Sequence, residues 1–272
     1  MKNIHKARKI KDFRDLIDFS AKKYSSRNAF KLRSDSGKYR KIKYRELKDR
    51  YYSLCSYFLS QGLKGESIAV VGDNSYEWTL CYLAAASVGV AVPLDKELSA
   101  EDIENFLRHA ECKAVCADEK IISRLAFKAE DGYELYSFED VDKAYSTLPC
   151  DRLEEVKSIE IPNDKTSVLI FTSGTTGSAK GVCLSQRNLL SNIHSTLSMV
   201  KITPKDRTLS ILPLHHTYEC TLDCLLMLSK GACITYSDSL LKVAKNTLEY
   251  SPTLLVVVPA LLKMMDRKIT KS

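Results

Sequence analysis

LIFTSGTTGSAKGV, the run from Leu169 to Val182, contains the most informative pattern in the chain. It continues an apolar stretch that begins at Ser167, as a buried strand does, and then changes to hydroxyl side chains and three glycines around a single lysine, Lys180. A second short apolar run, 181–184, follows directly. The sequence therefore predicts two buried strands joined by a polar, glycine-rich loop, which is a poor setting for a flexible linker.

The composition of this loop is typical of a polyphosphate-binding site. Glycines let the backbone turn tightly and bring its N–H groups against a ligand. Hydroxyl groups add donors or a Mg²⁺ ligand, and the ammonium group of Lys180 supplies charge for phosphate oxygens. The common nucleoside-triphosphatase loop needs glycine directly before the lysine and serine or threonine after it, whereas Ala179 and Gly181 stand there. No Gly-x-Gly-x-x-Gly dinucleotide fingerprint occurs.

Short apolar strands alternate with amphipathic helices on both sides of this loop. Strands are expected at 29–33, 39–44, 68–72, 91–94, 113–117, 167–171, 181–184, 207–212, 233–236 and 253–258. Helices are expected at 75–87, 186–199, 218–228 and 240–249, and others near Phe13, Leu47, Ser99 and Pro259. Residues 128–163 are polar and irregular, and we expect only weak elements there, at the surface. The alternation predicts an α/β fold with parallel sheets covered on both faces.

Residues 172–182 resemble the phosphate-loop signature of the adenylate-forming (AMP-binding) superfamily. This superfamily includes acyl-CoA synthetases, the adenylation domains of peptide synthetases, and luciferases. One departure is Ala179, where the family usually has proline, which changes loop stiffness more than chemistry. The resemblance covers nearly the whole chain and includes segments 42–47, 82–94, 212–219 and 251–259.

The resemblance implies the N-terminal domain of such an enzyme, built of two stacked, mostly parallel αβ subdomains and incomplete at the C-terminus. We expect residues 1–190 to form the first subdomain, with the phosphate loop at 172–181, and residues 191–272 to begin a second, truncated one. The family's later segments that hold adenine and ribose, and its C-terminal catalytic lid domain, are absent from this sequence. The chain is therefore expected to need a missing C-terminal half.

The family's phosphate contacts can be assigned to residues of the loop. By resemblance, the expected ATP contacts are Thr172, Ser173, Gly174, Thr175, Thr176, Gly177 and Lys180. Thr172 is also the candidate Mg²⁺ ligand.

The segment LPLHHTYE, residues 212–219, distinguishes the branches of the family. Peptide-synthetase domains usually carry a phenylalanine–aspartate pair near this point, whereas His216 and Glu219 look more like the long-chain and medium-chain acyl-CoA synthetases. In that branch the histidine lies beside the carboxylate-binding site. His216 is therefore the candidate catalytic residue, and His215 and Glu219 are candidates for the substrate pocket; a core or capping histidine is the alternative.

The implied activity is ATP-dependent conversion of a fatty acid to an acyl-adenylate and then to an acyl-CoA, with ATP, Mg²⁺ and CoA. Three alternatives stay open. The chain could belong to an adenylate-forming enzyme with a non-fatty carboxylate substrate, or it could be a non-catalytic nucleotide-binding remnant. A plain ATPase or kinase is disfavoured, because no acidic magnesium motif accompanies the loop.

The cysteines favour neither disulfides nor a metal. His216, Cys220 and Cys224 could share a helix face, but no fourth ligand has a matching spacing, so no zinc site is predicted. The nine cysteines lack framework spacing, which indicates free thiols in the cytoplasm.

The composition is that of an ordinary globular protein, with 44% hydrophobic and 28% charged residues. The net charge of +7 suits an anionic ligand or an anionic membrane surface, and no nucleic-acid partner is expected. The N-terminal basic residues are Lys2, Lys6, Arg8, Lys9, Lys11 and Arg14. They indicate a solvated terminus or a peripheral membrane contact. Neither a signal peptide nor a run of about 20 apolar residues, as a membrane span needs, is visible.

Overall fold

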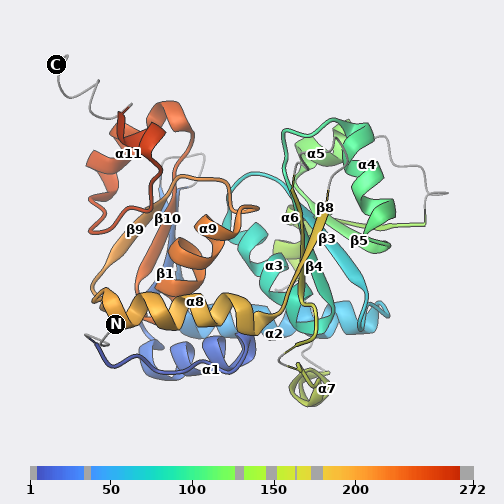
Figure 1. Ribbon diagram of the computed structural model, residues 1–272, viewed down its shortest axis with the longest axis horizontal. Helices are drawn as coiled ribbons and strands as arrows, with labels where there is room; N and C mark the ends of the chain where they lie inside the picture. The colour runs from blue at the N-terminus through green and yellow to red at the C-terminus, as the bar shows by residue number, and fades with distance from the viewer. Residues whose placement is uncertain are drawn as a thin grey trace.

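The structure is a computed structural model that describes residues 5–33, 38–125, 132–144, 152–162, 164–172 and 180–263. Two sheets lie side by side with helices between and around them (Figure 1). The sheets are mostly parallel, so the α/β class expected from the alternation of strands and helices is confirmed.

The larger sheet has the strand order β6-β5-β3-β4-β7-β8. Its strands are β3 (Ser67–Val71), β4 (Val90–Leu94), β5 (Cys112–Ala117), β6 (Glu134–Ser137), β7 (Val168–Thr172) and β8 (Lys180–Leu184). Neighbouring strands are parallel except for β7 and β8, which pair antiparallel. The two strands that flank the glycine-rich loop are therefore confirmed, and they lie at one edge of this sheet.

The smaller sheet has the order β2-β1-β10-β9. It joins β1 (Asn28–Arg33) and β2 (Tyr39–Lys43) to β9 (Arg207–Ser210) and β10 (Cys233–Tyr236). Strands β1 and β2, both expected from the sequence, pair antiparallel. Since β1 pairs with β10, this sheet joins residues from both sides of position 190.

Helix α3 (Tyr76–Val88) lies between the two sheets (Figure 1). It begins where the hydroxyl oxygen of Ser75 accepts a hydrogen bond from the N–H of Trp78 at 3.0 Å, a standard N-cap. Every residue of the helix except Glu77 is buried, because it has a sheet or another helix on every side. The main core cluster accordingly contains Phe30 from the smaller sheet together with Val70 from the larger one.

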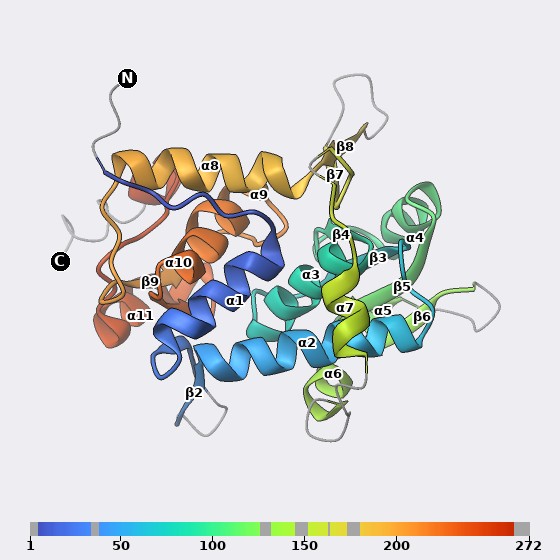
Figure 2. The same ribbon diagram turned by 90° about the horizontal axis from the view of Figure 1, so that it is seen from below.

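The outer helices cover the remaining faces. Helices α1 (Phe13–Tyr24), α2 (Tyr44–Ser60) and α8 (Gln186–Met199) lie on one side of the molecule, as Figure 2 shows. The other faces are covered by α4 (Ala100–His109) and α5 (Glu119–Arg124) on the larger sheet and by α11 (Val243–Tyr250) on the smaller one. The remaining short helices of the larger-sheet half are α6 (Phe138–Ala144) and α7 (Leu153–Ser158).

Three segments differ from expectation. Residues 134–137, expected to be weakly structured, form the edge strand β6, because pairing with β5 supplies the hydrogen bonds that local composition does not predict. The helix expected at 218–228 is α9 (Thr217–Glu219) and α10 (Leu226–Ser229) separated by a π-helical turn, Cys220–Leu225. In the stretch 253–258 the structure shows only an isolated bridge between Leu254 and Thr208, not a strand.

Candidate functional site

A cavity of about 680 Å³ lies where strands of both sheets end. Its walls follow the carboxyl ends of four parallel strands: residues 72–77 after β3, 95–97 after β4, 211–215 after β9 and 237–240 after β10. Ligands of parallel α/β sheets bind outside the carboxyl ends of the strands. The position of this cavity is therefore that of a ligand site.

His215 lines the cavity and is largely buried, with 13% of its side chain exposed. Its Nε2 atom lies 3.7 Å from Oδ2 of Asp95, which follows β4. Burial lowers the pKa of His215 to about 4, although the carboxylate of Asp95 acts in the opposite direction. The imidazole is therefore neutral near pH 7, when it can accept or donate a hydrogen bond.

His216, the candidate catalytic residue, is exposed and is not one of the lining residues of this cavity. Its ring centroid lies 4.2 Å from that of His215. The two neighbouring histidines thus lie in different surroundings. His215 faces the cavity between the sheets, and His216 is at the surface beside it.

Asn74 holds the segment that carries both histidines. Its Nδ2 donates to the carbonyl oxygen of Leu212 at 2.7 Å, and its Oδ1 accepts from the N–H of Leu214 at 3.0 Å. Asn74 follows β3 of the larger sheet, whereas Leu212 and Leu214 follow β9 of the smaller one. The side chain therefore connects the two sheets at the edge of the cavity.

Glu219, a candidate for the substrate pocket, is fully buried and is not a lining residue of the cavity. Its Oε1 accepts from the hydroxyl of Ser210 at 2.7 Å and from the N–H of Ile211 at 3.1 Å. One turn along the helix, Asp223 is also fully buried and accepts a hydrogen bond from the hydroxyl of Thr208. The two carboxyl groups thus attach this helix to β9 and to the residue that follows it.

The second oxygens of these two carboxyl groups, Glu219 Oε2 and Asp223 Oδ2, are buried and have no hydrogen-bond partner among the described residues. Burial raises the pKa of Glu219, and the neighbouring carboxylate of Asp223 raises it further. Burial also raises the pKa of Asp223. The pKa of Glu219, raised to about 9, keeps this group uncharged near neutral pH, and its proton can then be shared with the Asp223 carboxyl group.

Of the expected phosphate-loop contacts, Thr172 and Lys180 lie within the described residues, and both are exposed. They are paired across β7 and β8, and the hydroxyl of Thr172 donates to the carbonyl oxygen of Lys180 at 3.5 Å. The other expected contacts lie outside the described residues: Ser173, Gly174, Thr175, Thr176 and Gly177. Neither Thr172 nor Lys180 is a lining residue of the 680 Å³ cavity.

The described residues offer few metal ligands. They contain no group of three or more His, Cys, Asp and Glu side chains arranged to hold a metal ion. Cys220 and Cys224, which share a spacing with His216, are buried in the core. The exposed hydroxyl of Thr172 is a hard oxygen donor of the kind that Mg²⁺ accepts when phosphate oxygens supply other ligands.

Sequence reasoning did not identify Asn74, Asp95 and Lys96 as residues of the cavity. Lys96 donates to Asp73 at 2.5 Å at the cavity wall. A usable signal was present, because each of these polar residues comes within two positions of the end of an apolar strand expected at 68–72 or 91–94. The sequence did not indicate that these strand ends meet those of the smaller sheet.

Comparison with known proteins identifies relatives over most of the chain. Residues 17–272 match the family model described as AMP-binding enzyme. "Long chain acyl-CoA synthetase 4" of Arabidopsis thaliana is 30% identical over 259 residues, which cover 85% of this chain and 38% of that protein. The Arabidopsis thaliana "Oxalate--CoA ligase" is 28% identical over 81% of this chain and 44% of its own length.

Solved structures support the same fold. A long-chain-fatty-acid-CoA ligase from Archaeoglobus fulgidus superimposes with a TM-score of 0.84 over 100% of this chain and 56% of its own, at 20% sequence identity. The chain thus spans 38% of the length of the Arabidopsis synthetase and about half of the archaeal ligase. None of the described helices combines the length and apolar character that a membrane crossing requires.

Proposed function

The chain belongs to the AMP-binding enzyme family, and from this we propose that it supplies the phosphate-binding loop and the carboxylate-side histidines of an ATP-dependent acyl-CoA synthetase. The long-chain acyl-CoA synthetase among its relatives supports a fatty acid as the substrate. The observation that carries the proposal is the pairing of Thr172 with Lys180, at the two ends of the hydroxyl-rich loop.

This pairing supports phosphate binding. Strands β7 and β8 run antiparallel, so the intervening loop must leave and return at the same edge of the sheet. Lys180 then lies at the base of the loop with its side chain exposed, and its ammonium group is available to phosphate oxygens. The backbone N–H groups and hydroxyls of 173–179 would supply the remaining donors.

The surroundings of His216 support its place on the carboxylate side. It is exposed beside His215, which faces the cavity between the sheets. Asn74 and Glu219 both accept hydrogen bonds from backbone N–H groups of the segment before it. A carboxylate near this segment could accept a hydrogen bond from the neutral imidazole of His215, in competition with the Asp95 carboxylate 3.7 Å from that ring.

The proposed reaction has two steps. A carboxylate oxygen of the fatty acid attacks the α-phosphorus of ATP, forming the acyl-adenylate while the bond to the β-phosphate breaks and pyrophosphate leaves. The CoA sulfur then attacks the acyl carbonyl, and AMP leaves as the acyl–oxygen bond breaks. Lys180 would neutralise charge on the phosphates. Mg²⁺ would supply further charge neutralisation, and Thr172 is the residue of this chain that would meet it.

One alternative substrate has support of its own. An oxalate–CoA ligase matches most of this chain, so a short dicarboxylate is the competing carboxylate. The 680 Å³ cavity does not discriminate between the two, because its lining mixes charged residues such as Arg33 with apolar ones such as Leu212.

Isothermal titration of this chain with ATP and with non-hydrolysable acyl-adenylate analogues tests the proposal. We expect ATP to bind, and Lys180→Ala to weaken it by about tenfold or more, since a charge-assisted contact is lost. Lys113→Ala is the matched control, because Lys113 is an exposed lysine on β5 of the same sheet. His216→Ala should weaken a hexadecanoyl-adenylate analogue more than ATP itself.

The outcomes are distinct. If a folded Lys180→Ala variant binds ATP as tightly as the wild type, Lys180 does not belong to the ATP site. If the chain binds an oxalyl-adenylate analogue more tightly than the hexadecanoyl one, the proposed substrate is a short dicarboxylate and not a fatty acid. Pyrophosphate exchange tests turnover, and we expect little from this chain alone because it spans 38% of the length of its Arabidopsis relative. Robust turnover by the chain alone would contradict that expectation.

A further inference from the structure

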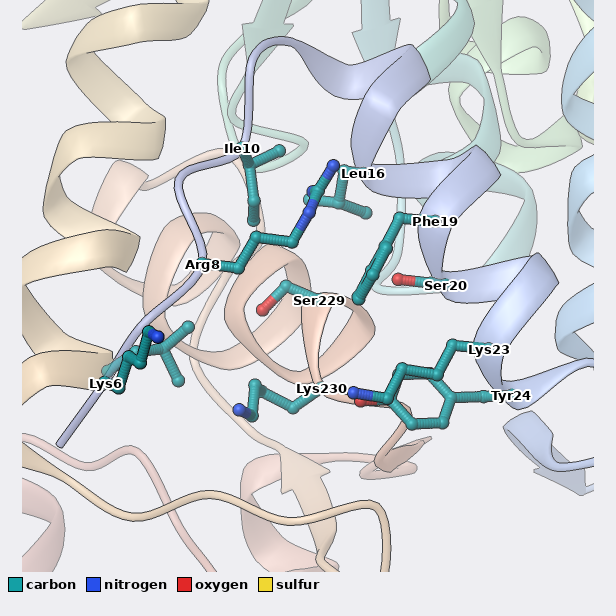
Figure 3. Close-up of a pocket in the computed structure, with 11 residues that line it drawn as sticks. Lys6, Arg8, Ile10, Leu16, Phe19, Ser20, Lys23, Tyr24, Ser229 and Lys230 are labelled. Carbon is teal, nitrogen blue, oxygen red and sulfur yellow. The ribbon is translucent and has the colours of Figure 1, made fainter.

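A second cavity, of about 140 Å³, lies on the side of the molecule formed by the N-terminal segment, α1 and the end of α10 (Figure 3). Four of its described lining side chains are cationic and none is acidic: Lys6, Arg8, Lys23 and Lys230. Its lining shares no residue with that of the 680 Å³ cavity. A hollow with this charge favours an anion.

The cations come from three separate parts of the chain. Lys6 and Arg8 belong to the N-terminal segment, which runs alongside α8 before α1 begins (Figure 2). That segment is held in place, because the N–H of His5 donates to the carbonyl oxygen of Ser198 at 3.0 Å and Ile10 packs against the main core. The positive side chains are therefore brought together by the fold rather than by neighbouring positions in sequence.

Helix dipoles explain part of this arrangement. Lys23 is in the last turn of α1 and Lys230 directly follows α10, and each helix end favours a nearby cation. This accounts for each lysine separately but not for their convergence. In Figure 3 the side chain of Lys23 extends toward Lys230. Burial lowers the pKa of Lys230, and the charge of Lys23 lowers it further.

Few carboxylates balance these charges. Arg8 forms an ion pair with Asp15 at 2.5 Å and lies 4.2 Å from the centre of the Phe19 ring. Lys23 lies 5.4 Å from the same ring centre. Within the described part of the chain, Lys6, Lys23 and Lys230 have no carboxylate partner. A doubly charged anion would relieve the repulsion between the lysines and gain charge-assisted hydrogen bonds.

The cavity also has apolar walls. Leu16, Phe19 and Leu197 lie beside the cationic side chains. A volume of about 140 Å³ exceeds many times the space that a single water needs, so a tetrahedral anion and part of the group attached to it can enter. From this combination we propose that the cavity binds a phosphate group, carried either by a small molecule or by a lipid headgroup.

Titration calorimetry with inorganic phosphate at constant ionic strength, and flotation with vesicles of phosphatidylcholine alone or mixed with phosphatidic acid, test this. We expect the wild-type chain to bind phosphate, phosphatidic acid vesicles or both. The double substitution Lys23→Gln and Lys230→Gln should weaken that binding by about tenfold or more. A second pair, Lys6→Gln and Arg8→Gln, should weaken phosphate binding as well. Loss of binding in both pairs could not be explained by misfolding caused by the substitution at Lys230.

Two single variants separate this site from other positive charges. Lys113→Gln removes an exposed charge on β5, far along the chain from the cavity, and should leave binding unchanged. Lys180→Gln measures how much of the phosphate binding belongs to the proposed ATP loop, and the loss caused by the two pairs is judged against that background, so failure of the proposed function does not affect this test. Binding of free phosphate assigns the site to a small molecule, and binding of phosphatidic acid vesicles alone assigns it to a headgroup. No binding of either, or binding insensitive to the two pairs, overturns the proposal.

Discussion

Asn74 Oδ1 accepts a hydrogen bond from the N–H of Leu214 at 3.0 Å, although the two residues follow strands of different sheets. The Nδ2 atom of the same side chain donates to the carbonyl oxygen of Leu212 at 2.7 Å. One amide thus satisfies two backbone groups of the segment that leads to His215 and His216. The Asn74 side chain thereby links the segment that carries both histidines to the larger sheet.

Asn74→Ala should therefore destabilise the protein. The substitution leaves a backbone N–H and a carbonyl group in a half-buried site without their partners, at a cost of about 1–3 kcal/mol. Urea unfolding measures this change. Asn105→Ala, at an exposed position of α4, is the control and should stay within about 0.5 kcal/mol of the wild type. An equal, small effect of both substitutions would show that the Asn74 amide does not hold the segment.

The buried carboxyl group of Glu219 predicts a loss of stability with rising pH. Its pKa is about 9 in the folded chain, against an ordinary value of 4.5, mainly because burial disfavours the charge. Between these values the folded state keeps a proton that the unfolded state has released. The free energy of unfolding then falls as pH rises, by up to about 1.4 kcal/mol per pH unit. The pKa of Asp223 is also raised in the folded chain. Asp223 therefore also makes the free energy of unfolding fall as pH rises, in a lower pH range.

Glu219→Gln keeps an oxygen acceptor for Ser210 and Ile211 and removes the titration. We expect its free energy of unfolding to change less than that of the wild type between neutral pH and about pH 9. Glu160→Gln, an exposed substitution, should follow the wild-type curve. Parallel curves for the wild type and Glu219→Gln would show that Glu219 is charged in the folded protein.

Gly89 ends α3 at a close approach of two backbone segments. A Cβ atom at this position would lie 2.1 Å from the carbonyl oxygen of Glu66, and backbone cannot move aside as a side chain can. Gly89→Ala should cost about 3 kcal/mol or more, at the upper end of overpacking effects. Gly65→Ala is the comparison, because Gly65 has φ +83° but no atom near its added Cβ. Gly65→Ala should cost only about 1 kcal/mol, because a residue with a Cβ atom is disfavoured in a left-handed backbone conformation. Similar melting temperatures for the two variants would contradict the close approach.

Local signals were sufficient for most elements. Helix α8 has the predicted bounds, because its apolar spacing is regular and Ser185 and Asn188 form a reciprocal cap at its start. Strands β3, β4 and β7 were located to within a residue or two, since buried strands of parallel sheets are continuously apolar. The helix expected near Ser99 is α4, and at its start the hydroxyl oxygen of Ser99 accepts from the N–H of Asp102.

Long-range pairing had no such signal. Strand β1 pairs with β10 about 200 residues away, at Phe30 and Ile234, and nothing in either segment specifies the other. The candidate site was affected in the same way. By resemblance, His216 was expected to be catalytic and His215 to belong to the substrate pocket, and of the two it is His215 that lines the cavity. Asn74 and Asp95 reach the cavity only because the two sheets meet there. The π-helical turn at Cys220–Leu225 was missed because an inserted residue does not change the apolar composition of the helix.

His215 should titrate far below the ordinary range. Its folded pKa is about 4, against an ordinary 6.5, because burial disfavours the charged ring. The unfolded chain therefore binds a proton first as pH falls, so His215 stabilises the fold at neutral pH and that contribution is lost between about pH 6.5 and 4. Imidazole NMR titration measures the pKa directly, with the exposed His109 as an internal comparison in the same spectrum. Asp95→Asn should lower the pKa of His215 further, because the Asp95 carboxylate, 3.7 Å away, favours the charged form. A titration in the ordinary range, or one that Asp95→Asn leaves in place, would mean that His215 is solvated and does not face the cavity as described.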